Sequence, residues 1–184
     1  GQNYRERRLD SGRLWPVVFY KDGRIPVEFL ADAASNLKRI SSILGPQVHV
    51  NRLDRLDFLL RDRIVIRLPR GIGTVFCPRP SRYLAHKLMT FTEREDDFKK
   101  AKDLMYAYFI LSYHPQMDGL SKEFRDFQAE DGFSLIGRNL DQYFSRLTGR
   151  GCLWVEKENG PDEFILDVRR DVFERFQGLK RRLS

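Results

Sequence analysis

The sequence predicts an α+β fold in which the strands come first and the helices follow. Short β-branched and aromatic runs alternate with turn signals over residues 14–77. After Pro80 the apolar residues recur at spacings of three and four, which is the period of a helix. Hydrophobic residues make up 41% of the 184 residues, so the chain can bury a core of its own.

The strand-rich part begins with a predicted hairpin. Residues 14–21 (LWPVVFYK) and 24–31 (RIPVEFLA) flank Asp22-Gly23, and Gly accepts the positive φ that a tight turn requires. Residues 31–44 predict either a helix closed by Gly45-Pro46 or a long connection with helical turns. Further short strands are predicted at 48–50, 57–60, 63–68 and 74–77.

The second part is predicted to be helical. Tyr83, Leu84, Leu88 and Phe91 form one apolar stripe on a helix that Pro80 helps to begin. Later elements are expected as helices over 98–113, 121–128 and 135–147, a hairpin of 152–157 with 163–168 around Asn159-Gly160, and a helix through 172–179. We therefore expect a strand-rich region over 1–78, and a helical region with a C-terminal hairpin and helix over 79–184.

The net charge and the composition limit the kinds of ligand and the cellular location that the chain suits. Lys and Arg number 33 against 26 Asp and Glu, which gives a net charge of +7. Such a charge suits nucleotides, nucleic acid or an anionic membrane, although it also serves solubility alone. The two cysteines fit neither a disulfide framework nor a zinc site, no signal peptide is recognised, and the longest apolar run, 104–111, is too short to span a bilayer. We expect a cytoplasmic protein with no membrane partner.

Three groups of residues could carry chemistry, and each has a structural alternative. Lys87 lies on the apolar stripe of its helix, so its ammonium either meets an anion in a cleft or extends over apolar surface into water. Lys99 and Lys102 with Asp103 could hold phosphate or form a solvated helix face. Glu28 could be a metal ligand on a strand or part of the wet face of a hairpin.

One glycine pattern gives little support for a nucleotide-binding loop. Gly71-x-Gly73 lacks the third glycine of the dinucleotide fingerprint and is not a P-loop, so a hairpin turn is predicted there.

Four segments occur in an order that resembles a known family: 24–31 (RIPVEFLA), 56–68 (LDFLLRDRIVIRL), 75–88 (VFCPRPSRYLAHKL) and 99–104 (KKAKDL). They resemble the C-terminal part of bacterial nucleotidyltransferase-fold proteins of the polymerase-β superfamily, whose relatives include nucleotidyltransferase toxins of abortive-infection systems. The similarity covers about residues 20–115. It implies a partial mixed or antiparallel sheet of the nucleotidyltransferase type, followed by the helical region.

The resemblance also implies roles for particular residues. Glu28 matches the third carboxylate of the family, which is catalytic and a ligand of Mg²⁺. Lys87, Lys102 and Asp103 match basic and acidic positions near the nucleotide, and Arg82 of the same segment as Lys87 joins this nucleotide-binding set. The implied reaction moves a nucleoside monophosphate from a nucleoside triphosphate to a hydroxyl of RNA, a protein or a small molecule, with Mg²⁺.

One departure from the family is clear. The family places Gly-Ser or Gly-Gly and then a D-x-D or D-x-E pair ahead of the third carboxylate, and no such pair precedes Glu28 here. The chain is therefore expected to be either a fragment or a degenerate member, and to be inactive alone. The alternatives are a basic, non-catalytic nucleic-acid-binding module and a structural subunit whose partner supplies the missing strands.

Overall fold

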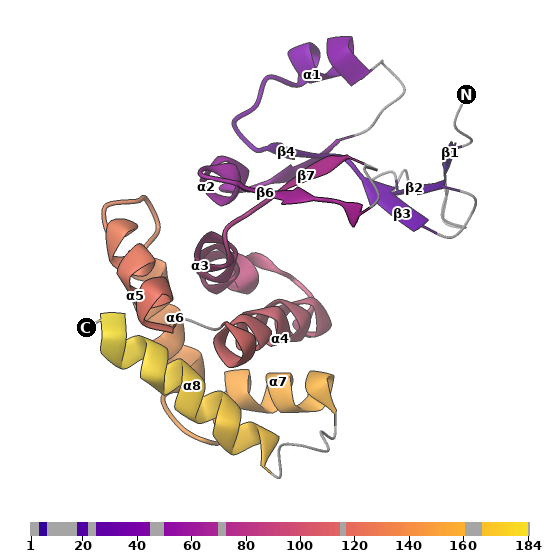
Figure 1. Cartoon of the computed structure of the whole chain (residues 1–184). Coiled ribbons are helices and arrows are strands. Elements are labelled where there is room, and N and C mark those ends of the chain that lie inside the picture. Colours follow the sequence, from indigo (N-terminus) through magenta and orange to yellow (C-terminus); the bar gives the residue numbers. More distant parts are fainter. Residues whose placement is uncertain are drawn as a thin grey trace. The chain divides into compact units, whose positions relative to one another are not determined.

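The structure is a computed structural model of the whole chain, and it describes residues 4–6, 18–21, 25–44, 50–69, 73–114, 117–160 and 167–183. The chain divides into two compact units, Gly1–Asp57 and Phe58–Ser184. Figure 1 shows their elements, which confirm the α+β class. The boundary expected at residue 78 stays a prediction.

The first unit contains a three-stranded antiparallel sheet in the order β1-β2-β3. Its strands are β1 (Tyr4–Glu6), β2 (Val18–Lys21) and β3 (Ile25–Glu28). The register pairs Lys21 with Ile25 and Val18 with Glu28, which confirms the predicted hairpin. Its turn at Asp22-Gly23 lies outside the described residues. β1, which the sequence did not predict, pairs with the other edge of β2.

The first unit also contains a parallel strand pair. β4 (Leu30–Asp32) and β5 (Asn51–Leu53) pair in register, and α1 (Leu37–Leu44) lies between them in sequence. The side chain of Asn36 caps α1 by accepting from the backbone N–H groups of Lys38 and Arg39 at 3.0 and 3.3 Å. The helical alternative for residues 31–44 is thus correct from Leu37 onward. Of the strand predicted at 48–50, residues 48 and 49 lie outside the described residues, and the strand β5 begins one residue later, at Asn51.

Asp32 fixes the end of β4. Its carboxylate accepts from the backbone N–H of Ala34 at 2.9 Å and from that of Asp57 at 3.0 Å. These hydrogen bonds, that from Asp57 first, hold the pKa of Asp32 below its usual value.

The strand predicted at 57–60 is wrong, because Leu56–Leu60 forms the helix α2. Leu56, Phe58 and Leu59 are buried while Asp57 and Leu60 are exposed. Burial of the adjacent residues 58 and 59 fits one face of a helix and breaks the alternation that a strand would show. Burial of one apolar face overrides the strand propensity of the run.

The second unit begins with a β-hairpin. β6 (Ile64–Arg67) pairs antiparallel with β7 (Thr74–Cys77), and Leu68 N–H donates to Gly73 O at 2.8 Å. The hairpin predicted from 63–68 and 74–77 is confirmed. Gly73 has φ +140°, a conformation that favours glycine.

Helices build the rest of the second unit: α3 (Pro80–Thr90), the 3₁₀ turn η2 (Phe91–Glu93), α4 (Asp97–Tyr113), α5 (Met117–Asp126), α6 (Ser134–Phe144), α7 (Arg150–Asn159) and α8 (Val168–Leu183). Pro80 occupies the first turn of α3, as predicted. Their apolar faces share one core, in which Phe91, Tyr108, Phe124, Phe144 and Phe176 are among the largest fully buried side chains. None of the helices within the described ranges is long and apolar enough to cross a membrane.

The C-terminal hairpin is a second wrong prediction. Its expected first strand is the helix α7, in which Cys152 and Val155 are fully buried while Leu153 and Lys157 are exposed. Gly160 has φ +71°, and its N–H donates to Glu156 O at 3.1 Å. The Asn159-Gly160 pair, interpreted from sequence as a hairpin turn, therefore ends a helix. Residues 161–166 lie outside the described residues.

Candidate functional site

A lysine and an aspartate from neighbouring helices form the centre of the candidate site. Lys87 lies on α3 between the buried Leu84 and Leu88, and its side chain is 12% exposed. Its Nζ donates to Oδ1 of Asp103 on α4, whose side chain is 8% exposed. The anion that the Lys87 ammonium meets is thus this carboxylate. The two nucleotide-site candidates that the sequence placed in separate motifs are in contact.

Asp103 also holds a second cation. Its Oδ2 accepts from Nε of Arg94 at 3.1 Å, and the Arg94 side chain is 35% exposed. Arg94 lies in the connection between η2 and α4, in extended backbone conformation. Nothing in the sequence indicates this contact, because Arg94 is a loop residue nine positions before Asp103.

Lys102 lies beside this pair without contacting Asp103. It is exposed, and its Nζ lies 5.9 Å from the ring centroid of Tyr106. The Lys87 Nζ lies at the same distance from that ring. Both ammonium groups thus lie near the same ring. We call Lys87, Arg94, Lys102 and Asp103 the α3–α4 charge cluster.

One lysine–aspartate pair forms within α4, and it does not involve Lys102. Lys100 Nζ, not Lys102 Nζ, pairs with a carboxylate of its own helix, that of Asp97 at 3.0 Å. This leaves Lys102 as the exposed cation of the α3–α4 charge cluster.

Two tyrosines adjoin the cluster. The rings of Tyr83 and Tyr106 meet edge to face with centroids 6.5 Å apart, and Lys87 Nζ lies 5.3 Å from the Tyr83 centroid. Burial, together with the negative charge of Asp103, raises the pKa of Tyr83 to about 12. Tyr83 is therefore a neutral phenol at neutral pH.

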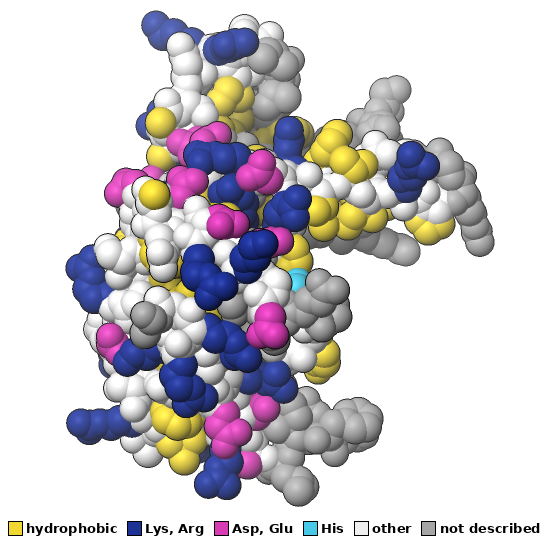
Figure 2. Space-filling view, turned by 60° about the vertical axis from the view of Figure 1, so that its left-hand side comes forward, with side chains coloured by type: hydrophobic (Ala, Val, Ile, Leu, Met, Phe, Trp, Pro, Cys, Tyr) yellow, Lys and Arg dark blue, Asp and Glu magenta, His cyan; other side chains and the backbone are white. Residues whose placement is uncertain are grey.

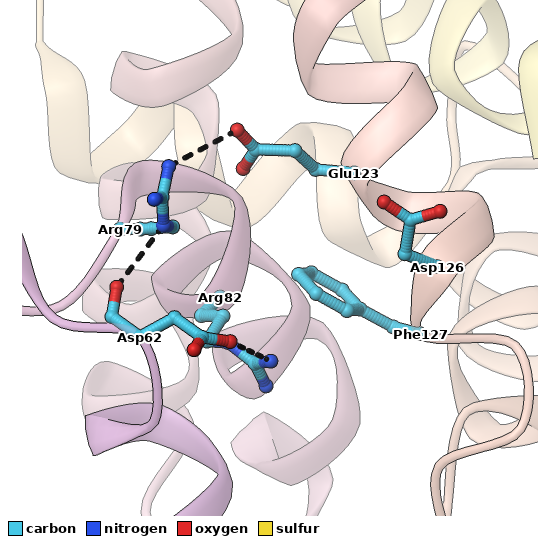
Figure 3. Close-up of a pocket in the computed structure, with 6 residues that line it drawn as sticks. All are labelled: Asp62, Arg79, Arg82, Glu123, Asp126 and Phe127. Carbon is cyan, nitrogen blue, oxygen red and sulfur yellow. Dashed lines mark hydrogen bonds and ion pairs between the residues drawn. The ribbon is translucent and has the colours of Figure 1, made fainter.

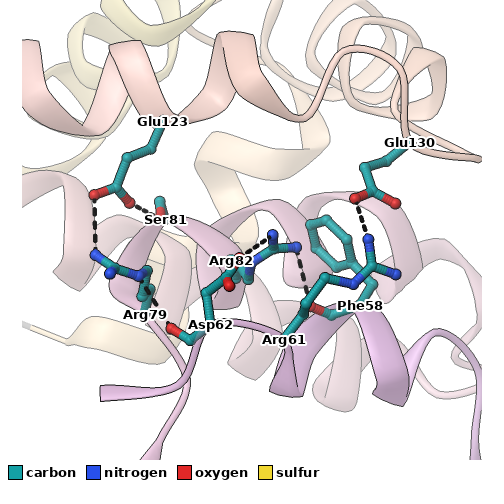
Figure 4. Close-up of polar contacts among 8 residues, drawn as sticks. All are labelled: Phe58, Arg61, Asp62, Arg79, Ser81, Arg82, Glu123 and Glu130. Atoms are coloured by element: carbon teal, nitrogen blue, oxygen red, sulfur yellow. Dashed lines mark hydrogen bonds and ion pairs between the residues drawn. The ribbon is translucent and has the colours of Figure 1, made fainter.

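Arg82, the remaining nucleotide-site candidate on α3, belongs to a different cluster. Five residues separate it from Lys87, which rotates it by roughly 140° around the helix. Its Nη2 donates to Asp62 Oδ2 at 2.8 Å and its Nη1 to Phe58 O at 3.3 Å (Figure 4). The guanidinium also packs over the rings of Phe58 and Phe127, at 4.9 and 4.5 Å, and the residue is 5% exposed.

The Arg82 cluster borders a cavity of about 320 Å³, whose lining residues are shown in Figure 3: Asp62, Arg79, Arg82, Glu123, Asp126 and Phe127. Arg79 donates through Nε to Asp62 O at 3.0 Å and lies 3.5 Å from Glu123, which also accepts from Ser81. Arg79 and Arg82 both donate to protein oxygens, although Nε of Arg82 has no hydrogen-bond partner in the part of the chain that the structure describes. The cavity is lined by three carboxylates, those of Asp62, Glu123 and Asp126, against these two guanidinium groups. The surrounding charges favour a structural ion-pair network over a phosphate site.

Glu28, the predicted catalytic and metal-binding residue, lies in the first unit. Its backbone is in β3, paired with Val18, and its side chain is outside what the structure describes. In the described residues no group of three or more His, Cys, Asp or Glu could hold a metal ion. The role of Glu28 as a metal ligand stays a prediction.

The distribution of surface charge bears on the nucleic-acid alternative. Figure 2 shows Lys and Arg side chains over much of one face, with Asp and Glu side chains among them. On that face the positive charge is not gathered into one uninterrupted patch.

Comparison with known proteins gives one match. Residues 7–130, more than half of the chain, match the model of a family described as nucleotidyltransferase. The match includes both β3 with Glu28 and the α3–α4 charge cluster. Neither the curated proteins nor the solved structures give a match.

Proposed function

The chain belongs to a nucleotidyltransferase family, and on that premise we propose that its α3–α4 charge cluster binds the phosphates of a nucleoside triphosphate. The observation that carries the proposal is the contact between Lys87 and Asp103. It joins the HKL and KKAKDL segments, the two that the family resemblance associates with the nucleotide.

The charges of the cluster support an anionic ligand. Three cations surround one carboxylate, so the cluster keeps a net charge of +2. Charge-assisted hydrogen bonds to phosphate oxygens are among the stronger polar contacts that proteins make. Two of the cations, Arg94 and Lys102, are accessible to a ligand.

Asp103 has a positioning role in this proposal. An isolated lysine side chain is flexible and loses much rotamer freedom when it binds a ligand. The ion pair with Asp103 fixes the Lys87 ammonium beforehand and offsets part of the cost of burying it. The cluster is thus preorganised.

The finer features of the function are also proposals. We infer that Glu28 supplies one carboxylate ligand to Mg²⁺ and that the reaction transfers a nucleoside monophosphate to a hydroxyl of RNA, a protein or a small molecule. Mg²⁺ would neutralise phosphate charge during such a transfer. Because the chain has no D-x-D pair ahead of Glu28, it is not expected to perform the transfer alone.

The order of the four segments supports a place in the polymerase-β superfamily, among bacterial proteins related to abortive-infection nucleotidyltransferase toxins. A cytoplasmic location remains part of the same proposal.

Binding of ATP, GTP, CTP and UTP to the purified protein, measured by isothermal titration calorimetry, tests the proposal. At least one triphosphate is expected to bind. Lys87→Met is expected to weaken it by about tenfold or more, because it lowers the net charge of the cluster from +2 to +1 and removes the cation that fixes Asp103. Lys122→Met is the matched control, since Lys122 is an exposed lysine of α5. Equal affinities for the wild-type protein and Lys87→Met, or no binding at all, would contradict the proposal.

A further inference from the structure

We propose that Arg94 binds the polyphosphate chain of the nucleotide through hydrogen bonds from both terminal amino groups of its guanidinium. The Asp103 carboxylate holds Arg94 in position. This inference rests on the proposed function and adds a residue that the sequence motifs did not indicate. It follows from the exposure, hydrogen bonding and backbone support of Arg94.

Exposure distinguishes the two cations that Asp103 holds. The side chain of Lys87 is 12% exposed and that of Arg94 is 35% exposed, while Asp103 itself is 8% exposed. Asp103 carries one negative charge for two positive ones. The uncompensated positive charge of this triad is therefore most accessible at Arg94.

The hydrogen bonding of Arg94 leaves its outer edge available. Asp103 accepts from Nε, and among the described residues neither terminal amino group of Arg94 donates a hydrogen bond. A guanidinium is planar, so holding Nε fixes the plane in which the terminal groups point. Two parallel N–H groups in that plane match the oxygens of a phosphate.

The backbone around Arg94 is supported on both sides. Its N–H donates to Phe91 O at 3.2 Å at the end of η2, and Phe91 is fully buried. Two residues later, the Asp96 side chain caps α4 by accepting from Phe98 N–H at 2.8 Å. The connection that carries Arg94 is thus short and anchored, which limits the entropy lost when a ligand binds.

Inorganic tripolyphosphate, ATP and AMP are the probes for this proposal, because they separate the phosphate chain from the nucleoside. Arg94→Gln is expected to weaken both tripolyphosphate and ATP by about tenfold or more, with little change for AMP. Arg94→Lys keeps the positive charge but loses the two parallel N–H groups of the guanidinium. Its affinity for tripolyphosphate and ATP should therefore lie between those of Arg94→Gln and the wild-type protein. Arg138→Gln, at an exposed arginine of α6, is the matched control and should bind as the wild-type protein does.

The outcomes separate this inference from the proposed function. If Lys87→Met weakens ATP binding and Arg94→Gln does not, the cluster binds nucleotide without Arg94 and the inference is overturned alone. If the wild-type protein binds none of the probes, both fail. The inference would also be overturned if Arg94→Gln weakened the binding of AMP as much as that of ATP. The same holds if Arg94→Gln kept full affinity while only Arg94→Lys bound more weakly. Thermal unfolding of each variant shows whether the fold is kept, and Arg94→Lys tests the two parallel N–H groups even if Arg94→Gln unfolds.

Discussion

Asp103 is the residue on which the candidate site depends, because it accepts from two cations at once. Lys87 binds one carboxylate oxygen and Arg94 the other. A buried ion pair is a weak source of stability compared with apolar packing, yet removing one partner leaves the other charges buried and uncompensated.

Asp103→Asn is therefore expected to lower the free energy of unfolding by about 2–4 kcal/mol, since the amide cannot balance Lys87 and Arg94. Urea denaturation followed by circular dichroism measures it. Asp118→Asn is a suitable control, because Asp118 is an exposed aspartate at the start of α5. A loss no greater than that of the control would mean that water compensates the two cations.

The sequence alone could identify most residues of the candidate site, but it could not predict which of them are in contact. Lys87 and Asp103 each stood out, the first as a charge on an apolar stripe and the second beside a lysine cluster. Their contact depends on how α3 packs against α4, which no local pattern encodes. Arg94 was missed for the same reason.

The helix α7 shows most clearly how packing decides an element. Its first turn lies against the aromatic core, and a Cβ placed on Gly151 would lie 2.5 Å from Cζ of Phe144. Phe144 cannot retreat, because its ring is fully buried and stacked on Phe176 with centroids 3.9 Å apart. Glycine at this position permits the close approach of α7 to α6.

Gly151→Ala is accordingly expected to destabilise the protein by about 1–3 kcal/mol through overpacking. Gly137→Ala in α6 is the matched control, since a Cβ there meets nothing within 4 Å. The control should gain up to about 1 kcal/mol, because alanine favours the helix. Thermal or urea unfolding measures both changes, and equal effects at the two glycines would show that Phe144 can move.

Elements with a strong local signal could be predicted, and those decided by packing could not. The β2–β3 and β6–β7 hairpins, α3, α4 and α8 follow from turn residues and from apolar period. α2 and α7 were predicted as strands, because short apolar runs do not distinguish a buried helix from a strand. In the structure, the buried residues of both segments lie on one face of a helix and do not alternate as in a strand.

The apolar core and the candidate site residues are distributed unevenly between the two units of the chain. The apolar core formed by α3 to α8 lies entirely within Phe58–Ser184, and so does the α3–α4 charge cluster. The first unit contains Glu28 and the two small sheets of β1 to β5. The cations proposed to bind phosphate and the predicted metal-binding carboxylate therefore belong to different units.

This division predicts that residues 58–184, expressed alone, fold cooperatively and keep their affinity for tripolyphosphate. The reason is that both the core and the phosphate-binding cations remain present. Circular dichroism on heating and calorimetric titration measure the two properties. A folded 58–184 fragment that no longer binds would show that residues 1–57 take part in phosphate binding.

The anchored connection between η2 and α4 has a consequence for protein engineering and for the evolution of the site. Residues 94–96 connect the end of η2 to the capped start of α4, so a single inserted residue there would displace the Arg94 guanidinium while leaving Lys87 and Asp103 in place. Loop-length variants at this connection would change the discrimination between long and short phosphate chains without touching either helix. On the proposed role of Arg94, the length of this connection as well as its residues would affect which phosphate chains bind.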